Sequence, residues 1–278
     1  MTIDLSGRVA IVTGGGRGLG KAMTLALVEA GADVVAAGHI ADDIPVIEAA
    51  AKAVGRGRVH AMVTDVRKYA DCEKAVEAAL AKFGGLHMLV NNAGLGMTLV
   101  NQNFTRELPP FWTVNPAIWQ EIMDVNANGP FYMARAAIGH MRQQNWGRIV
   151  NVAADIETMQ RRGYMPYGCS KGALEGFTVA SSLDLSDTGV TVNILVPGGP
   201  TDTDILPGKK GATDRDGTGR VILSPDVMRK PIVWLASNES DGLTCRRYVG
   251  KDWDVSLPNN EAARRASRPA GFVRREDA

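Results

Sequence analysis

The sequence predicts an α/β fold in which one doubly wound parallel sheet carries helices on both faces. Short apolar runs alternate with longer helical patterns along residues 1–255, and no repeat or linker interrupts them. Glycine accounts for 31 of the 278 residues, against about 7% in an average protein. Because strict strand–helix alternation requires right-handed crossovers, we expect parallel strands within a single domain over residues 1–255.

The first strand is predicted over residues 8–13, an apolar run rich in β-branched side chains that glycines end. The first helix follows over residues 19–30 and stops at Gly31. Further strands are predicted at 34–37, 59–64, 88–90, 149–152, 190–196 and 247–249. Further helices are predicted at 44–54, 69–83, 117–141, 167–186 and 225–236. On such a sheet, ligands bind at the carboxyl ends of the strands, where the winding reverses.

The composition excludes several classes of protein. Hydrophobic residues make up 45% and charged residues 22% of the chain, which excludes extended disorder. A net charge of +1 argues against a nucleic-acid or membrane-surface partner. No apolar run approaches the roughly 20 residues of a spanning helix, and the N-terminus lacks a signal-peptide core. Three scattered cysteines and four unclustered histidines indicate a cytoplasmic location and no metal site.

Residues 256–278 differ from the rest of the chain, because they combine many arginines with few apolar side chains. We therefore expect a solvated or partner-packed extension here. Its arginines are Arg264, Arg265, Arg268, Arg274 and Arg275.

A glycine-rich turn, TGGGRGLG at residues 13–20, joins the first strand to the first helix. Glycines allow positive φ angles and a close approach of the backbone to a ligand. The helix N-terminus adds free N–H donors and a positive dipole end, which suit a pyrophosphate. A turn of this kind can be only a tight junction, but its position at the first strand–helix junction favours a dinucleotide site. The predicted contacts are Gly14, Gly16, Arg17, Gly18, Leu19 and Gly20.

Four further motifs follow the T-G-x-x-x-G-x-G turn in order: Asn-Asn-Ala-Gly at 91–94, Asn126, Tyr-x-x-x-Lys at 167–171, and Pro-Gly at 197–198. Over residues 5–253 the chain thereby resembles the short-chain dehydrogenase/reductase (SDR) family. The resemblance implies a Rossmann-type fold, a nicotinamide cofactor, a small carbonyl or alcohol substrate, and a homodimer or homotetramer. It also implies cofactor contacts at Asp65, Val66, Asn92, Ala93, Gly94, Tyr167, Lys171, Pro197, Gly198 and Thr203.

The end of the second strand bears on the choice between NAD and NADP. An acid there binds the ribose 2′-hydroxyl and would repel a 2′-phosphate. Gly38 stands where NAD users of the family usually carry Asp, and His39 stands where NADP users often carry Arg. Arg17 can also reach a 2′-phosphate, whose geometry a guanidinium matches. We predict that NADP(H) is preferred and NAD(H) possible; alternatively, His39 and Arg17 face solvent and either cofactor is accepted.

Tyr167 and Lys171 lie four positions apart on a predicted helix and therefore share one face. A free phenol has a pKa near 10, and a nearby ammonium lowers it. The pair then suits a general acid/base that protonates an alkoxide or deprotonates an alcohol. By resemblance, Lys171 also holds the nicotinamide ribose, and Asn126 anchors a proton-relaying water. The predicted catalytic residues are Asn126, Tyr167 and Lys171.

One departure from the family pattern concerns the substrate oxygen. The family's hydroxyl residue, usually Ser, lies thirteen positions before the Tyr, and this chain has Ala154 there. Losing one such donor typically costs about 10²–10³ in rate. Three explanations stay open. Asp155, if protonated, or Thr158 supplies the contact; the substrate's own polar group or a water does; or the protein is a weak enzyme or a catalytically silent dinucleotide-binding or sensor protein.

Two segments are candidates for the substrate side. Residues 94–126 exceed the usual family spacing and form either a stiff pocket rim or a packed loop or subunit contact. Their prolines and aromatics are Phe104, Pro109, Pro110, Phe111, Trp112 and Trp119. Residues 199–223 are rich in glycine and charge, and by resemblance form a mobile lid.

Overall fold

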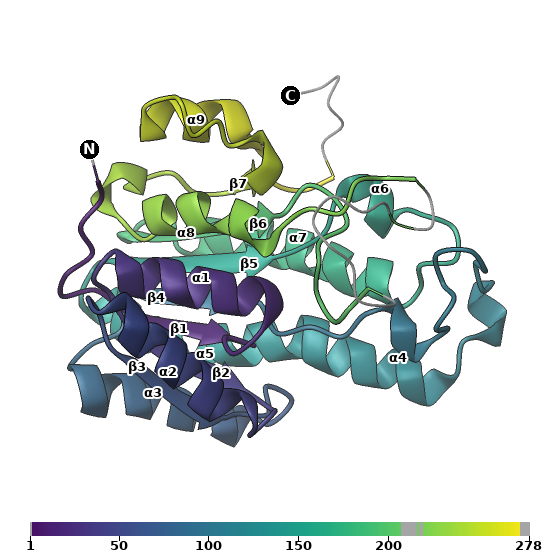
Figure 1. Ribbon diagram of the computed structural model, residues 1–278, viewed down its shortest axis with the longest axis horizontal. Helices are drawn as coiled ribbons and strands as arrows, with labels where there is room; N and C mark the ends of the chain where they lie inside the picture. The colour runs from purple at the N-terminus through teal and green to yellow at the C-terminus, as the bar shows by residue number, and fades with distance from the viewer. Residues whose placement is uncertain (1, 207–215, 217–218, 273–278) are drawn as a thin grey trace.

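The computed structural model describes residues 2–206, 216 and 219–272, and Figure 1 shows a single twisted sheet between two layers of helices. Within this part of the chain the strands follow the order β3-β2-β1-β4-β5-β6-β7-β8. Neighbouring strands are parallel except β8, which runs antiparallel to β7. The strands are β1 (Val9–Thr13), β2 (Asp33–Gly38), β3 (Val59–Val63), β4 (Met88–Asn91), β5 (Gly147–Val152), β6 (Val190–Val196), β7 (Arg246–Val249) and β8 (Ser267–Pro269).

The helices cover the sheet on both sides and seal two apolar cores against it. The α-helices are α1 (Gly18–Glu29), α2 (Asp43–Val54), α3 (Tyr69–Phe83), α4 (Pro116–Met123), α5 (Gly129–Gln143), α6 (Ile156–Met159), α7 (Tyr167–Asp184), α8 (Arg229–Leu235) and α9 (Asn259–Ala266). Residues of α1 and α8 build one core and residues of α3 and α5 the other. Every residue of β1 and β6 is buried, as expected of strands covered on both faces. No helix in the described residues is long and apolar enough to cross a membrane.

The strand order determines where a ligand can enter. β1 lies between β2 and β4. From β1 the chain winds outward through β2 and β3 on one side, and from β4 it continues through β5, β6 and β7 on the other. Loops that leave the carboxyl ends of β1 and β4 therefore separate and open a crevice. The predicted fold class, a doubly wound sheet with helices on both faces, is thus confirmed, with one antiparallel strand added at its edge.

Two predicted helices are interrupted in the structure. Residues 117–141 form α4, a π-helical segment over Asp124–Asn128, and α5. Residues 225–236 form a 3₁₀ turn over Pro225–Met228 and then α8. A π-helical turn inside a helical stretch often marks a functional position, and this one carries Asn126, whose side chain is fully buried.

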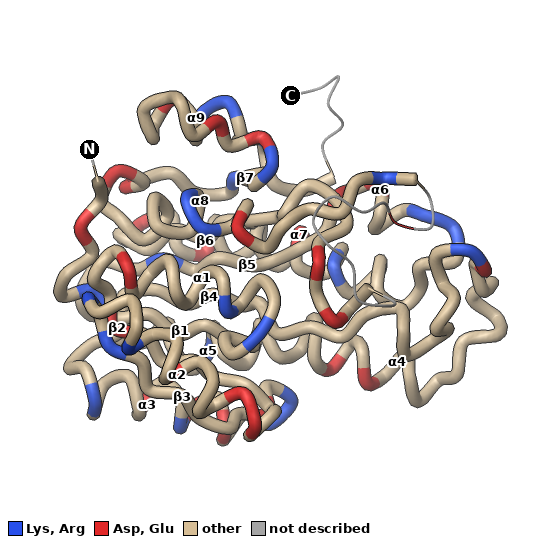
Figure 2. Tube along the Cα trace, in the orientation of Figure 1, with Lys and Arg blue, Asp and Glu red and all other residues tan. Residues whose placement is uncertain are grey.

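The prediction of a solvated or partner-packed extension is wrong for α9 and β8. Ala262, Ala263 and Ala266 are buried in the core formed with α1 and α8, and β8 pairs with β7. Composition concealed this, because three alanines on one helix face make only a narrow apolar stripe beside charged residues. Arg264 and Arg265 remain largely exposed; Arg274 and Arg275 lie outside the described residues. Basic and acidic residues are interspersed along the part of the trace that Figure 2 colours.

The packing of α9 gives a test of stability. The indole N–H of Trp234 donates to Asn260 Oδ1 at 2.8 Å, and Trp234 also stacks against Trp253. Truncation after Val255 would expose this core and leave the indole unpaired, so we expect Tm to fall by roughly 6 °C or more and tryptophan emission to shift to longer wavelength. A control truncated after Phe272 keeps α9 and β8 and should match the full chain. Equal Tm values for all three would contradict a structural role for α9.

Candidate active site

A pocket of about 440 Å³ lies at the carboxyl ends of the strands. It brings together side chains and turns that are far apart in the sequence, from the glycine loop to the segment after β6. The predicted residues that line it are Gly14, Gly16, Arg17, Gly18, Leu19, His39, Asp65, Val66, Asn92, Ala93, Gly94, Ala154, Asp155, Tyr167, Lys171, Pro197 and Thr203. Gly20, Asn126 and Gly198 lie behind this lining, packed against Gly14, Leu95 and Lys251.

The glycine loop forms a cradle at one end of the pocket. Gly14 and Gly18 have φ angles of +63° and +50°, a conformation that favours glycine. A Cβ at residue 20 would overlap the carbonyl oxygen of Gly14, so only glycine lets α1 begin this close to the loop. The N-terminus of α1 consequently faces the pocket with free N–H groups, and this arrangement fits the pyrophosphate of a dinucleotide.

Thr13 and Asn92 fasten the ends of β1 and β4 together beneath the cradle. The Thr13 hydroxyl accepts from the backbone N–H of Asn92 at 2.9 Å and of Ala93 at 3.0 Å. In return, Asn92 Nδ2 donates to the Thr13 carbonyl at 2.8 Å. These bonds place the Asn-Ala-Gly segment against the glycine loop, on the wall of the pocket.

Tyr167 and Lys171 occupy the first turns of α7, on the opposite side of the pocket. Lys171 Nζ donates to the Val152 carbonyl at 2.8 Å and lies 5.9 Å from the centroid of the Tyr167 ring. Asn126 Nδ2 donates to the Leu95 carbonyl at 2.9 Å and to Ser170 Oγ at 3.0 Å. A Cβ at Gly94 would stand 3.4 Å from Asn126 Oδ1 and 3.5 Å from Lys171 Nζ. The three predicted catalytic residues therefore surround Gly94 and the start of α7.

Desolvation controls the ionisation of both side chains. Burial lowers the pKa of Lys171 to about 8. Burial also raises the pKa of Tyr167, and the charge of Asp155 and the neighbouring Tyr164 raise it further. This direction is opposite to the one predicted from the ammonium alone, because removal from water penalises the phenolate. At neutral pH, Tyr167 is accordingly a neutral phenol that can donate a proton.

The segment after β5 carries the position at which the resemblance expects a hydroxyl residue. Ala154 is buried, and its carbonyl accepts from Arg247 Nη1 at 2.9 Å. Asp155 follows it on the pocket wall; burial raises the pKa of its carboxyl, while the charge of Arg247 opposes that rise. Arg247 is also paired with Glu175, whose Oε2 accepts from the backbone N–H of Gly271 at 2.8 Å.

Sequence reasoning missed Arg247 and Glu175. Arg247 lies 93 positions from the carbonyl it holds, and no motif spacing indicates such a contact. Burial lowers the pKa of Arg247 to about 10. The pair joins β7, α7 and the C-terminal segment behind the Ala154 carbonyl, so contacts among these three segments hold this part of the pocket wall.

The aromatic loop divides between the interior and the surface. Phe104 is buried and packs edge-on against Tyr164, which also lines the pocket. Phe111 and Trp112 are 64% and 75% exposed. Phe104 therefore contributes to the pocket wall as predicted for the rim, whereas Phe111 and Trp112 face away from the core.

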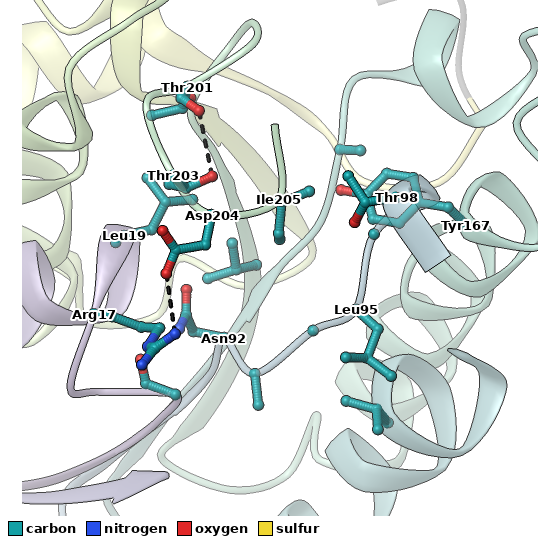
Figure 3. A pocket seen from close by; sticks show the side chains of 18 of the residues that line it. Arg17, Leu19, Asn92, Leu95, Thr98, Tyr167, Thr201, Thr203, Asp204 and Ile205 are labelled. Atoms are coloured by element: carbon teal, nitrogen blue, oxygen red, sulfur yellow. Dashed lines mark hydrogen bonds and ion pairs between the residues drawn. The ribbon is translucent and has the colours of Figure 1, made fainter. Parts of the chain in front are cut away.

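The start of the expected lid crosses the pocket. Thr203 lies against Gly18, and Ile205 lies against Gly96 on the other wall (Figure 3). Thr203 Oγ1 donates to the Thr201 carbonyl at 3.3 Å. Much of the lid, residues 207–215 and 217–218, lies outside the described residues.

Comparisons with known proteins agree with this geometry. A family model described as short chain dehydrogenase matches residues 8–212. The chain belongs to this family. A 3-alpha-(or 20-beta)-hydroxysteroid dehydrogenase of Mycobacterium tuberculosis is 34% identical over 252 residues, 90% of each chain. A 2-dehydro-3-deoxy-D-gluconate 5-dehydrogenase of Escherichia coli is 32% identical over 245 residues, 86% of this chain and 91% of its own. The structure of a dehydrogenase/reductase from Sinorhizobium meliloti 1021 has a TM-score of 0.73 at 30% identity, covering 87% of this chain and 93% of that one.

Membership makes the protein an oxidoreductase of the short-chain type that acts on CH–OH groups of small molecules with NAD(P)(H) as cofactor. The glycine cradle fits such a cofactor, since a Cβ at residue 14 or 20 would close it against Asn92. The cradle and the Tyr167 phenol lie at two ends of one pocket, which matches the extended shape of a dinucleotide.

The lowered pKa of Lys171 predicts a pH dependence of stability. Between pH 8 and 10.5 the unfolded chain binds a proton that the folded chain has released. The Lys171 contribution to the free energy of unfolding should therefore rise with pH in this window, by up to about 3 kcal/mol. Urea unfolding of the wild type and Lys171→Met at pH 7 and pH 10 measures the difference. Lys230→Met, an exposed control on α8, should follow the wild type; parallel curves for Lys171→Met would refute the prediction.

Proposed function

We propose that the enzyme interconverts a carbonyl and a secondary alcohol by NADP(H)-dependent hydride transfer, with Tyr167 as the general acid/base. One observation carries the proposal: a phenol and a buried ammonium face the same pocket as the glycine cradle. The nicotinamide, when bound, supplies the hydride, so the protein has to hold the substrate and move one proton.

Each residue then has a defined task. The phenol O–H of Tyr167 donates its proton to the carbonyl oxygen during reduction and accepts one during oxidation. Lys171 would hold the nicotinamide ribose, and its position beside Asn126 near Gly94 suits a proton relay through a water. Because the pKa of Tyr167 is raised, the neutral phenol, which is the proton-donating form, predominates at neutral pH.

The preference for NADP(H) rests on the far end of the pocket. Arg17 and His39 line it, and Gly38 brings no carboxylate to the end of β2. A guanidinium there would recognise a 2′-phosphate. The cytoplasmic location and the dimer or tetramer expected from the sequence stay predictions. The related enzymes are named for steroid, sugar-acid and hydroxybutyrate substrates, and what their names share is a hydroxyl oxidised to a carbonyl.

Ala154 supports a second candidate function, a dinucleotide-binding protein with little or no catalysis. Its methyl group cannot donate to a substrate oxygen, and its own carbonyl, which accepts from Arg247 Nη1, offers no donor either. Cofactor binding without turnover on ketones, aldehydes and quinones would favour this candidate over the enzyme.

Replacing the phenol tests the main proposal. Tyr167→Phe removes one oxygen from the pocket and should lower kcat by roughly 10²-fold or more, because it removes the proposed proton donor. The cofactor Kd should change by less than about 3-fold, since the glycine cradle is untouched. Steady-state kinetics and cofactor titration measure the two effects. An unchanged kcat would remove Tyr167 from the reaction.

We also propose that the Asp155 carboxyl, in its protonated form, supplies the contact that Ala154 lacks. Asp155→Ala should lower kcat by roughly 10–10²-fold, whereas Asp155→Asn, whose amide always carries a donor, should retain most of the activity. Ala154→Ser in the Asp155→Ala background should restore turnover by supplying the usual hydroxyl. Steady-state turnover of the three variants decides the matter: full activity in Asp155→Ala would show that this carboxyl does not contact the substrate.

A further inference from the structure

A second charged cluster, separate from the catalytic residues, lies at the cofactor end of the pocket. Asp43, the first residue of α2, lines the pocket beside Gly16 and Arg17. Arg17 Nε donates to Asp43 Oδ2 at 2.7 Å, and Arg17 Nη2 donates to Asp43 Oδ1 at 2.8 Å. This is a bidentate pair, the strongest geometry for a guanidinium and a carboxylate. The guanidinium is therefore engaged before any ligand arrives.

Asp204 adds a second carboxylate to the same guanidinium from the start of the lid. Arg17 Nη1 donates to Asp204 Oδ2 at 3.0 Å (Figure 3). The two acids differ in solvent exposure: the Asp204 side chain is 78% exposed and that of Asp43 only 24%. Asp43 consequently makes two contacts in a partly desolvated position, and Asp204 makes one at the surface.

Asp43 lies in the part of the pocket wall where dinucleotide folds bind the adenosine ribose. Its Cβ stands 2.7 Å from where a side chain at Gly16 would begin, so it lies directly against the glycine loop. Gly38 and His39 at the end of β2 belong to the same part of the wall. Dinucleotide folds commonly place an acid about 20 residues beyond the glycine loop, where it accepts a hydrogen bond from the ribose 2′-hydroxyl. Gly38 leaves that place without a carboxylate, and Asp43 reaches the same part of the wall from α2.

The charges around Arg17 reduce the advantage that its guanidinium gives a phosphate at this position. Hydrogen bonding from Arg17 lowers the pKa of Asp43, so its carboxylate is ionised at neutral pH. A phosphate monoester carries about −1.5 to −2 charges, and it would meet two carboxylates around the one guanidinium it needs. A neutral 2′-hydroxyl, by contrast, can donate to Asp43 while the ion pair stays intact.

We propose that Asp43 is a cofactor-specificity residue, which competes with the 2′-phosphate of NADP(H) for Arg17 and accepts a hydrogen bond from the 2′-hydroxyl of NAD(H). The inference rests on the proposed function, because it requires a nicotinamide dinucleotide in this pocket. It implies that the preference for NADP(H) is smaller than Arg17 alone would give.

The test is the cofactor affinity of Asp43→Asn in the full chain. NADPH and NADH are titrated at one fixed salt concentration, with nicotinamide fluorescence or calorimetry reporting Kd without substrate. NADPH should bind roughly 3–20-fold more tightly than to the wild type, and NADH equally or somewhat less tightly. The ratio of the two Kd values therefore shifts toward NADPH. Asp43→Ser serves the same purpose if the amide impairs folding, with Tm as the check.

Two acids of this chain provide matched controls. Asp42→Asn removes the same charge one residue away, from an exposed side chain that forms no ion pair within the described residues. Asp204→Asn removes the single exposed contact to Arg17. Each should change the Kd ratio by less than about 3-fold. A Kd ratio that stays constant in Asp43→Asn and Asp43→Ser, or an equal shift in Asp42→Asn, would overturn the proposal.

Arg17→Gln separates this proposal from the proposed function. Loss of NADPH affinity in Arg17→Gln, with a constant Kd ratio in Asp43→Asn, would leave Arg17 as the phosphate ligand and reject Asp43. Absence of binding of either dinucleotide to the wild type would instead reject the proposed function itself.

Discussion

The rest of the structure depends on the hydrogen bonds that join Thr13 to the Asn92 segment. They tie the ends of β1 and β4 at the place where the sheet changes its direction of winding. The glycine loop leaves from one strand and the Asn-Ala-Gly segment from the other, so a shift here would move both walls of the pocket together. Gly94, held in this way, lies against both Asn126 and Lys171.

Removal from water is the main cause of the pKa shifts in the pocket. It raises the pKa of Tyr167, lowers that of Lys171 and raises that of Asp155. Each shift disfavours a charge that water would stabilise, and the shift of Lys171 to about 8 brings that side chain close to neutral pH. Arg247 opposes the rise at Asp155. It also forms a buried ion pair with Glu175, and the two side chains hold the Ala154 carbonyl and the Gly271 N–H behind this side of the pocket.

The two ends of the pocket differ in how far their ionisable side chains are exposed to water. At the α7 end, an ammonium and a phenol are buried, and the proposed reaction depends on which of them carries a proton. At the cofactor end, Arg17 and Asp43 stay partly exposed and ionised, and their mutual attraction is what a ligand has to replace. Exposed pairs are individually weak, which makes this end suitable for discrimination between cofactors that differ by one phosphate.

The sequence by itself determined the features that depend on neighbouring positions along the chain. Alternating apolar runs predict the doubly wound sheet, glycines at a strand–helix junction predict the cradle, and a Tyr and a Lys four positions apart share a helix face wherever that helix lies. Tertiary structure alone decided which distant groups meet: Arg247 behind Ala154, Asp43 against Arg17, and the alanines of α9 against Trp234. It also decided the direction of the Tyr167 pKa shift, because desolvation depends on everything packed around a group, and spacing within one segment carries no information about that.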